Sequence, residues 1–203
     1  MKHHHPTLAG DPIGKSFLAT MPDEMLLALI ATHDKDAMHA LFVRHNVRIF
    51  RFLAHILGDA TTAEDLVSEV FIEVWRNADR FEGRSKASTW ILAIARFKAA
   101  SVRRRRSYDQ LDESAIERLE DPADNAETGV QKKHREAILR DCLKQLSPAH
   151  REILNLIYYQ EQSVADVAQI IGVPPSTVKT RAFYARKHMA ELMAARGLER
   201  ASL

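Results

Sequence analysis

One stretch of the chain carries many positive side chains and no negative ones. Between Arg84 and Arg106 there are eight lysines or arginines and no aspartate or glutamate. Such a density of cations predicts contact with a polyanion, for example the phosphates of a nucleic acid. The sign then reverses, because the segment from Ser107 to Gln131 has eight acidic residues against Arg118 alone. This change predicts a binding element followed by a tether that avoids the same polyanion.

A second candidate site lies toward the end of the chain. Ser163 can cap a short helix, Gly172 allows the left-handed turn after it, and Pro175 suits the first turn of a longer helix. This pattern predicts a helix-turn-helix, whose second helix could read base edges in the major groove of DNA. The alternative is a corner of a helical bundle with a solvated basic face. The predicted outer residues of the second helix are Ser176, Thr177, Lys179, Thr180, Arg181, Tyr184, Arg186 and Lys187.

A third charged group shares one face of a predicted helix. Asp65, Glu69 and Glu73 are spaced four residues apart and therefore form an acidic ridge. This acidic ridge is a candidate partner for a basic coiled coil. A solvated helix face is the alternative.

The elements that must position these groups are predicted to be helical. The chain has 203 residues, of which 46% are hydrophobic, and only seven glycines and seven prolines, a composition that favours helices over a sandwich or barrel rich in turns. Apolar periodicity and capping signals predict helices over 23–32, 36–57, from 62, from Ser88 or Thr89, from 133, over 147–159, 163–171 and 176–193. We therefore predict an all-α protein with two small helical domains joined by a flexible acidic linker.

The expected domain boundaries follow the changes in composition. They are a loosely ordered segment over 1–22, a first helical domain over 23–106, an acidic linker over 107–132, a helix-turn-helix domain over 133–197 and a tail over 198–203.

Several stretches together resemble the extracytoplasmic-function (ECF, group IV) sigma factors of the sigma-70 family. Order and spacing agree from about residue 34 to residue 195. The matching stretches are Asp36–Phe42, Ala63–Arg76, Phe81–Ser85, Thr89–Ile91, Ile94–Arg96, Leu146–Glu152 and Ser176–Arg181. The resemblance implies a transcription initiation factor without a catalytic site. Its first domain would be sigma region 2, which docks on the β′ clamp helices and melts the −10 element, and its second would be region 4, which binds the β flap and reads the −35 element.

The resemblance also implies roles for individual residues. The −10 contacts would fall on Arg84, Ser85, Lys86, Ser88, Thr89, Arg96, Lys98, Arg103, Arg104, Arg105 and Arg106, and the −35 contacts on the outer face of the helix-turn-helix. The polymerase contacts would fall on Asp65, Glu69, Glu73 and Arg76. Trp90 is expected to anchor the core. Phe97, Ser101 and Tyr184 depart from residues frequent in the family, so the promoter sequence stays open.

The expected partners are core RNA polymerase, promoter DNA and an anti-sigma factor that wedges between or wraps regions 2 and 4. No cofactor or metal is expected. The longest apolar run, Met25–Ala31, is too short to span a bilayer. A single cysteine, Cys142, and the lack of a signal-peptide pattern predict a cytoplasmic protein.

Two other classes of protein remain as alternatives. A stand-alone dimeric helix-turn-helix regulator would use region 4 but would leave the basic stretch and the acidic linker without a role. A metal-dependent HD-type phosphohydrolase could use His33 and Asp34 with His39, His45 and His55, although no distant aspartate completes that set.

Overall fold

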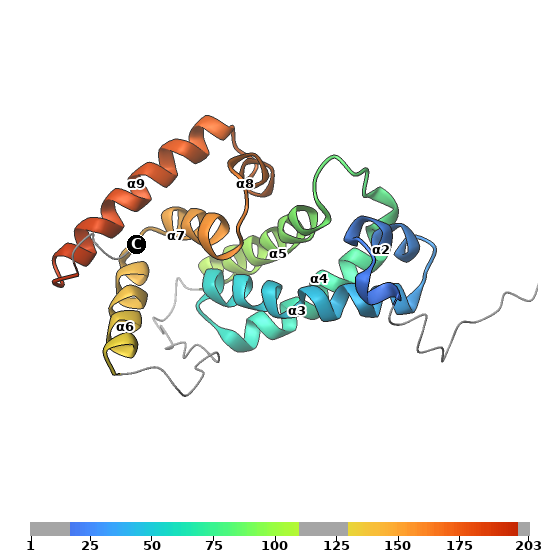
Figure 1. The fold of residues 1–203 in the computed structure, drawn as a ribbon, viewed down its shortest axis with the longest axis horizontal. Coiled ribbons are helices and arrows are strands. Elements are labelled where there is room, and N and C mark those ends of the chain that lie inside the picture. The colour runs from blue at the N-terminus through green and yellow to red at the C-terminus, as the bar shows by residue number, and fades with distance from the viewer. Residues whose placement is uncertain (1–16, 110–129, 199–203) are drawn as a thin grey trace, which may run out of the picture.

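The computed structural model describes residues 17–109 and 130–198, which form helices with no strand among them (Figure 1). The helices are α2 (Asp23–Ile30), α3 (Lys35–Leu57), α4 (Ala60–Asn77), α5 (Ala87–Asp109), α6 (Val130–Gln145), α7 (Pro148–Leu154), α8 (Val164–Ile171) and α9 (Pro175–Ala194). The all-α prediction with two helical regions is confirmed. The terminal segment over 1–16, residues 110–129 of the expected linker and the tail from residue 199 lie outside the described residues.

Helices α2 to α5 form the N-terminal group. Helix α3 packs against both α4 and α5, and each contributes an apolar stripe at helical spacing to one buried core. Its largest fully buried side chains include Leu41, Ile49, Phe52, Leu53, Val70, Ile91 and Leu92. Trp90 packs against this core with its ring 5.6 Å from that of Phe81, as expected for a core anchor.

The beginnings of two helices differ from the sequence-based expectation. Helix α4 begins at Ala60 because Asp59, directly after the left-handed Gly58, is its N-cap and accepts a hydrogen bond from the backbone of Thr62. Thr62 therefore lies inside the first turn. Helix α5 begins at Ala87, before Ser88 and Thr89. The reason is distant in sequence, because Oε1 of Glu24 accepts a hydrogen bond of 3.1 Å from the backbone N–H of Ala87.

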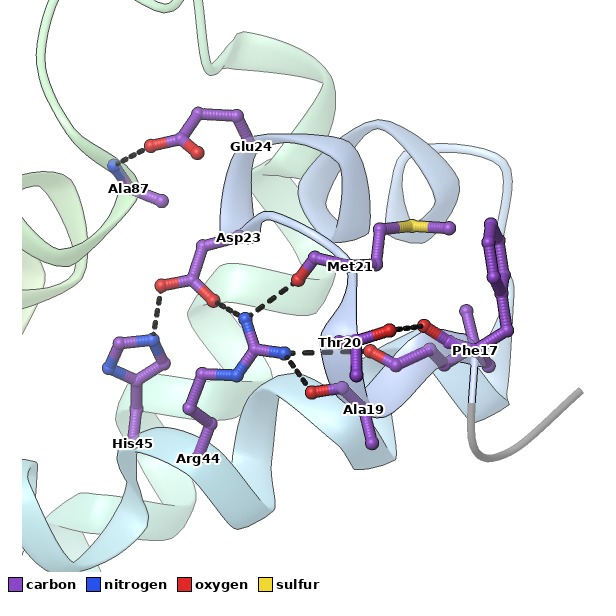
Figure 2. Close-up of polar contacts among 10 residues, drawn as sticks. Phe17, Ala19, Thr20, Met21, Asp23, Glu24, Arg44, His45 and Ala87 are labelled. Carbon is purple, nitrogen blue, oxygen red and sulfur yellow. Dashed lines mark hydrogen bonds and ion pairs between the residues drawn. The ribbon is translucent and has the colours of Figure 1, made fainter.

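Polar contacts around Asp23 fix α2 on α3 (Figure 2). The Asp23 carboxylate accepts hydrogen bonds from Arg44 and, at 2.7 Å, from Nε2 of the buried His45. Burial alone would raise the pKa of Asp23, but His45 and then Arg44 lower it below its ordinary value. Arg44 also donates to backbone carbonyls of the preceding residues, including Met21 at 2.9 Å. Helix α3 thus holds the N-terminal end of α2, and α2 in turn holds the start of α5 through Glu24.

Helices α6 to α9 form the C-terminal group and contain the predicted helix-turn-helix. Ser163 and Asp166 make a capping box at the start of α8, and Gly172 ends this helix with a φ of 68°. A small core joins α6, α7 and α9 and consists of Cys142, Leu143, Leu146, Leu154, Ala185, Met189 and Met193. The predicted single helix to Tyr159 is wrong in detail, because α7 ends at Leu154 and a π-helical turn follows over Asn155–Tyr159.

The two groups contact each other. Helix α5 packs against α8, and α3 packs against α7 (Figure 1). The main buried cluster continues across this junction, since it includes Ile153 and Leu156 near α7 as well as Val167 and Ile171 of α8. The sequence predicted two domains on a tether and gave no indication of this shared core.

Candidate nucleic-acid interface

The second helix of the helix-turn-helix, α9, presents a polar and basic face to solvent. Val178, Ala182 and Ala185 are buried and hold α9 on the other helices, which leaves the opposite face free. Of the predicted contact residues, Thr177 and Arg181 are half-buried. The exposed ones are Ser176, Lys179, Thr180, Tyr184, Arg186 and Lys187.

An exposed aromatic residue on the same face was not among the predicted contacts. Phe183 is 56% exposed and its ring centroid lies 5.4 Å from that of Tyr184. Its spacing from Ser176 and Thr180 places it on the predicted outer face. Spacing could therefore have identified Phe183, although phenylalanine more often lies in a core than on a binding face.

The loop before α5 exposes some of its predicted contacts and buries one. Arg84 is exposed and pairs with Glu82, and Lys86 is also exposed. Ser85 and Ser88 are half-buried. Thr89, by contrast, is only 1% exposed. The loop therefore offers cations to solvent, while its threonine faces another part of the protein.

That other part is the helix-turn-helix. The hydroxyl of Thr89 lies 3.0 Å from Oδ1 of Asp166 and 3.1 Å from Oε1 of Gln162, and both oxygens are hydrogen-bond acceptors. Burial alone would raise the pKa of Asp166, but the hydrogen bonds from Ser163 and Thr89 lower it below its ordinary value. The carboxylate that caps α8 therefore also binds the first turn of α5.

The basic residues of α5 point toward different neighbours. Arg96 donates a 2.8 Å hydrogen bond to Glu152. Arg106 donates to Asp59 at 2.5 Å, and hydrogen bonds from Thr62 and then Arg106 lower the pKa of Asp59 to about 2. The exposed cations in this part of α5 are Arg103, Arg104 and Arg105. Acids from other elements thus neutralise part of the positive charge that the segment from Arg84 to Arg106 carries.

The acidic ridge is exposed but is also linked to α5. Asp65, Glu69 and Arg76 are exposed, and Glu73 is half-buried. Nζ of Lys98 lies 3.5 Å from the carboxylate of Glu69 and 3.4 Å from that of Glu73. Lys98, which was predicted to contact DNA, is therefore a neighbour of Glu69 and Glu73, which were predicted to contact polymerase.

Phe97 lies next to Lys98 and is 72% exposed. This position departs from the family pattern, and its aromatic ring faces solvent on a helix rich in cations. Ser101, the other departure on α5, is half-buried one turn further along.

The histidines considered for an enzyme site make separate contacts. Asp34 caps α3, and the ring of His33 lies 5.5 Å from that of Trp75. His45 binds Asp23, and His55 lies against Tyr159. Within residues 17–109 and 130–198, no group of three or more His, Cys, Asp or Glu side chains could hold a metal ion. In the same ranges, no helix has the length and apolar character needed to cross a membrane.

Two family models match the chain. Sigma-70 region 2 matches residues 41–108, and sigma-70 region 4 matches residues 136–189. The first range covers most of α3 to α5, and the second covers much of α6 to α9.

Similar proteins match over most of both chains. The ECF RNA polymerase sigma factor SigL of Mycobacterium tuberculosis is 29% identical over 153 residues, which cover 73% of this chain and 84% of SigL. SigK of Mycobacterium bovis is 27% identical over 162 residues, which cover 78% of this chain and 86% of SigK. The structure of the sigma factor RpoE of Bartonella quintana in complex with the anti-sigma factor NepR has a TM-score of 0.65 and 26% identity, with 75% of this chain and 94% of that chain covered. Together with the two matching regions, these likenesses establish that the chain belongs to the ECF sigma factors of the sigma-70 family.

Proposed function

We propose that this protein is a cytoplasmic, non-enzymatic sigma factor that binds core RNA polymerase and directs it to promoters. The observation that carries the proposal is the pairing of two surfaces in one chain. One is the exposed polar face of α9 in region 4, and the other is the cationic α5 with its preceding loop in region 2. Region 4 would read the −35 element as duplex, and region 2 would open and hold the −10 element.

In region 4, the N-terminal turns of α9 would contact base edges. Ser176, Lys179 and Thr180 are exposed there and offer hydroxyl and ammonium groups. Phe183 continues the same face and could contact a thymine methyl group. Arg186 and Lys187, further along α9, are placed to contact phosphates, which fix position but carry no sequence information.

In region 2, the loop before α5 would hold an unpaired base of the −10 element. Arg84, Lys86, Ser88 and Thr89 lie together at this loop, and Phe97 adds an exposed ring on α5. Extruding a base costs a few kcal/mol, which stacking and phosphate contacts must offset. Arg103, Arg104 and Arg105 would supply the phosphate contacts.

Beside α5 in region 2, α4 would dock on polymerase. Asp65 and Arg76 supply exposed charges, and Ile72 between them is 49% exposed. Ile72 would add an apolar contact within this charged face. We propose that an anti-sigma factor competes with polymerase for this surface, by analogy with the RpoE structure, which holds the anti-sigma factor NepR.

Dependence on core polymerase tests the proposed function. The free chain should bind promoter duplex weakly and with strong salt dependence, because it has little energy of its own to open DNA. Run-off transcription on genomic promoter fragments should start at specific sites only when core enzyme is present. Tight site-specific binding to a palindromic duplex by the free protein would instead support the stand-alone regulator.

Reversal of one ridge charge tests polymerase docking. Asp65→Lys is preferred because Lys98 already binds Glu69 and Glu73. Placing a cation opposite a basic surface should weaken core binding about tenfold or more. Glu64→Lys changes an exposed neighbour by the same charge and is the matched control. Equal core affinities of the two variants in a fluorescence titration would show that the docking face has been placed wrongly.

Two sets of alanine variants separate base contacts from phosphate contacts. Lys179→Ala should lower initiation selectively at promoters that need the −35 element, by about 1–3 kcal/mol for each lost base contact. Arg104→Ala with Arg105→Ala should weaken binding to all promoters and reduce its salt slope. Arg51→Ala, an exposed arginine on α3, is the control. The division fails if the two sets give the same profile from promoter to promoter.

A further inference from the structure

A small crevice lies where the C-terminal ends of α3 and α5 meet α7 (Figure 1). Its volume is about 120 Å³, and a water molecule fills about 30 Å³ of the liquid, so a group of several heavy atoms such as a phosphate has room there. Its lining residues are His55 and Ile56 of α3, Arg103 of α5, and Pro148, Arg151 and Glu152 of α7. The side chains that can carry a positive charge therefore outnumber the single acid.

The acid of the crevice is already engaged. Glu152 accepts a 2.8 Å hydrogen bond from Nε of Arg96, and its side chain is only 16% exposed. Arg103 and Arg151, by contrast, form no ion pair with any side chain that the structure describes. Burial and then the positive charge of Arg103 lower the pKa of Arg151, because like charges disfavour each other. An anion bound between the two guanidiniums would remove this repulsion.

Arg151 is held in place and still has donors to offer. Its Nε donates to the carbonyl of Leu143 at 3.1 Å, and its Nη2 donates to the carbonyls of Lys144 at 2.8 Å and Leu146 at 3.2 Å. These carbonyls lie at the C-terminal end of α6, so Arg151 caps that helix. Within residues 17–109 and 130–198, its Nη1 has no hydrogen-bond partner. The two N–H groups of Nη1 therefore remain for a ligand.

Arg103 has its whole guanidinium available. It is exposed, and it makes no hydrogen bond to the part of the chain that the structure describes. Its five N–H donors form a planar fork that matches the oxygens of a phosphate. Arg104 and Arg105 are exposed as well but do not line the crevice. Arg103 thus differs from its two neighbours because it shares the crevice with a second arginine.

An aromatic surface adjoins these cations. The ring of His55, which lines the crevice, lies 6.1 Å from the ring of Tyr159, and Tyr159 is 58% exposed. Tyr158 beside it is 55% exposed. Neither tyrosine is part of the surfaces assigned to DNA or to polymerase. Exposed aromatic rings close to arginines are groups on which nucleobases stack.

We infer that the crevice between α3, α5 and α7 binds the phosphate groups of a small ligand, held by Arg103 and Arg151. Two sources of such phosphates fit the site. One is a nucleotide, whose base would stack on Tyr159, and the other is an inorganic polyphosphate, which would use the cations alone. The inference goes beyond the proposed function and does not rest on it. In the free chain Arg103 would serve this site, while Arg104 and Arg105 stay available for DNA.

The test is isothermal titration calorimetry of the full chain with ADP, GDP and inorganic pyrophosphate. Salt is kept at about 0.15 M, where charges more than about 8 Å away are largely screened. We expect one saturable site, which Arg103→Ala weakens about tenfold or more. Arg104→Ala removes the same charge from the next residue of α5 and should change the affinity less than about twofold. No saturable binding of any of the three ligands, or equal losses in the two variants, would overturn the inference.

A second variant should strengthen binding, which general destabilisation would not do. Glu152→Gln keeps the shape of the side chain and an oxygen that can accept from Arg96, but it removes the negative charge of the crevice. The affinity for pyrophosphate should rise about threefold or more. Glu191→Gln, at an exposed position on α9 that does not line the crevice, is the control and should leave the affinity unchanged. A loss of affinity in Glu152→Gln contradicts the site, provided that circular dichroism shows intact helices.

The aromatic surface distinguishes the two sources. Tighter binding of ADP or GDP than of pyrophosphate, with the difference lost in Tyr159→Ala, assigns the site to a nucleotide. Equal binding of all three ligands, unchanged in Tyr159→Ala, assigns it to an inorganic polyphosphate, and either result supports the inference. None of these titrations contains DNA or polymerase, so a failure of the proposed function would appear separately, as the absence of specific initiation with core enzyme.

Discussion

The structure depends on α5, which has to be the centre of the fold and a cationic binding element at the same time. Its buried side, with Ile91 and Ala95, completes the core of region 2. Its remaining sides carry cations that cannot all face solvent on a helix surrounded by α3, α4 and α8. The neighbouring elements therefore supply acids, among them Glu73 to Lys98 and Glu152 to Arg96. One of these acids, Glu152, belongs to region 4, so the contact between the two regions also neutralises part of the charge of α5.

The same arrangement links the surfaces that would bind polymerase and DNA to the surface that region 4 covers. Polymerase would bind the acidic ridge of α4, which is connected to α5 through Lys98, and DNA would bind α5 and α9. Region 4 covers part of the DNA surface of α5 through Thr89 and Arg96. Because each partner uses groups that another contact already engages, binding of one changes what is available to the next. A separate inhibitor could act on such a chain by stabilising a contact that is already present.

Local sequence patterns predicted the elements well and the long-range contacts poorly. The capping box at Ser163 and the turn at Gly172 were predicted because each depends on residues within one helical turn. The start of α5 was not, because its cap is Glu24, which is 63 residues away in sequence. For the same reason the exposed Lys86 was distinguishable from the buried Thr89 only in the structure. Pairing across elements depends on tertiary packing, which periodicity does not encode.

The central claim is that promoter DNA and region 4 use the same face of α5 in turn. The most direct measurement is energy transfer between a label on α4 (Ser68→Cys) and a label on α8 (Ala165→Cys), both at exposed positions of a chain whose native thiol is removed by Cys142→Ala. It is made before and after assembly with core polymerase and a promoter that it transcribes. The account predicts high transfer in the free chain and its loss in the initiation-competent complex. Active complexes that retain the high transfer of the free chain would contradict it.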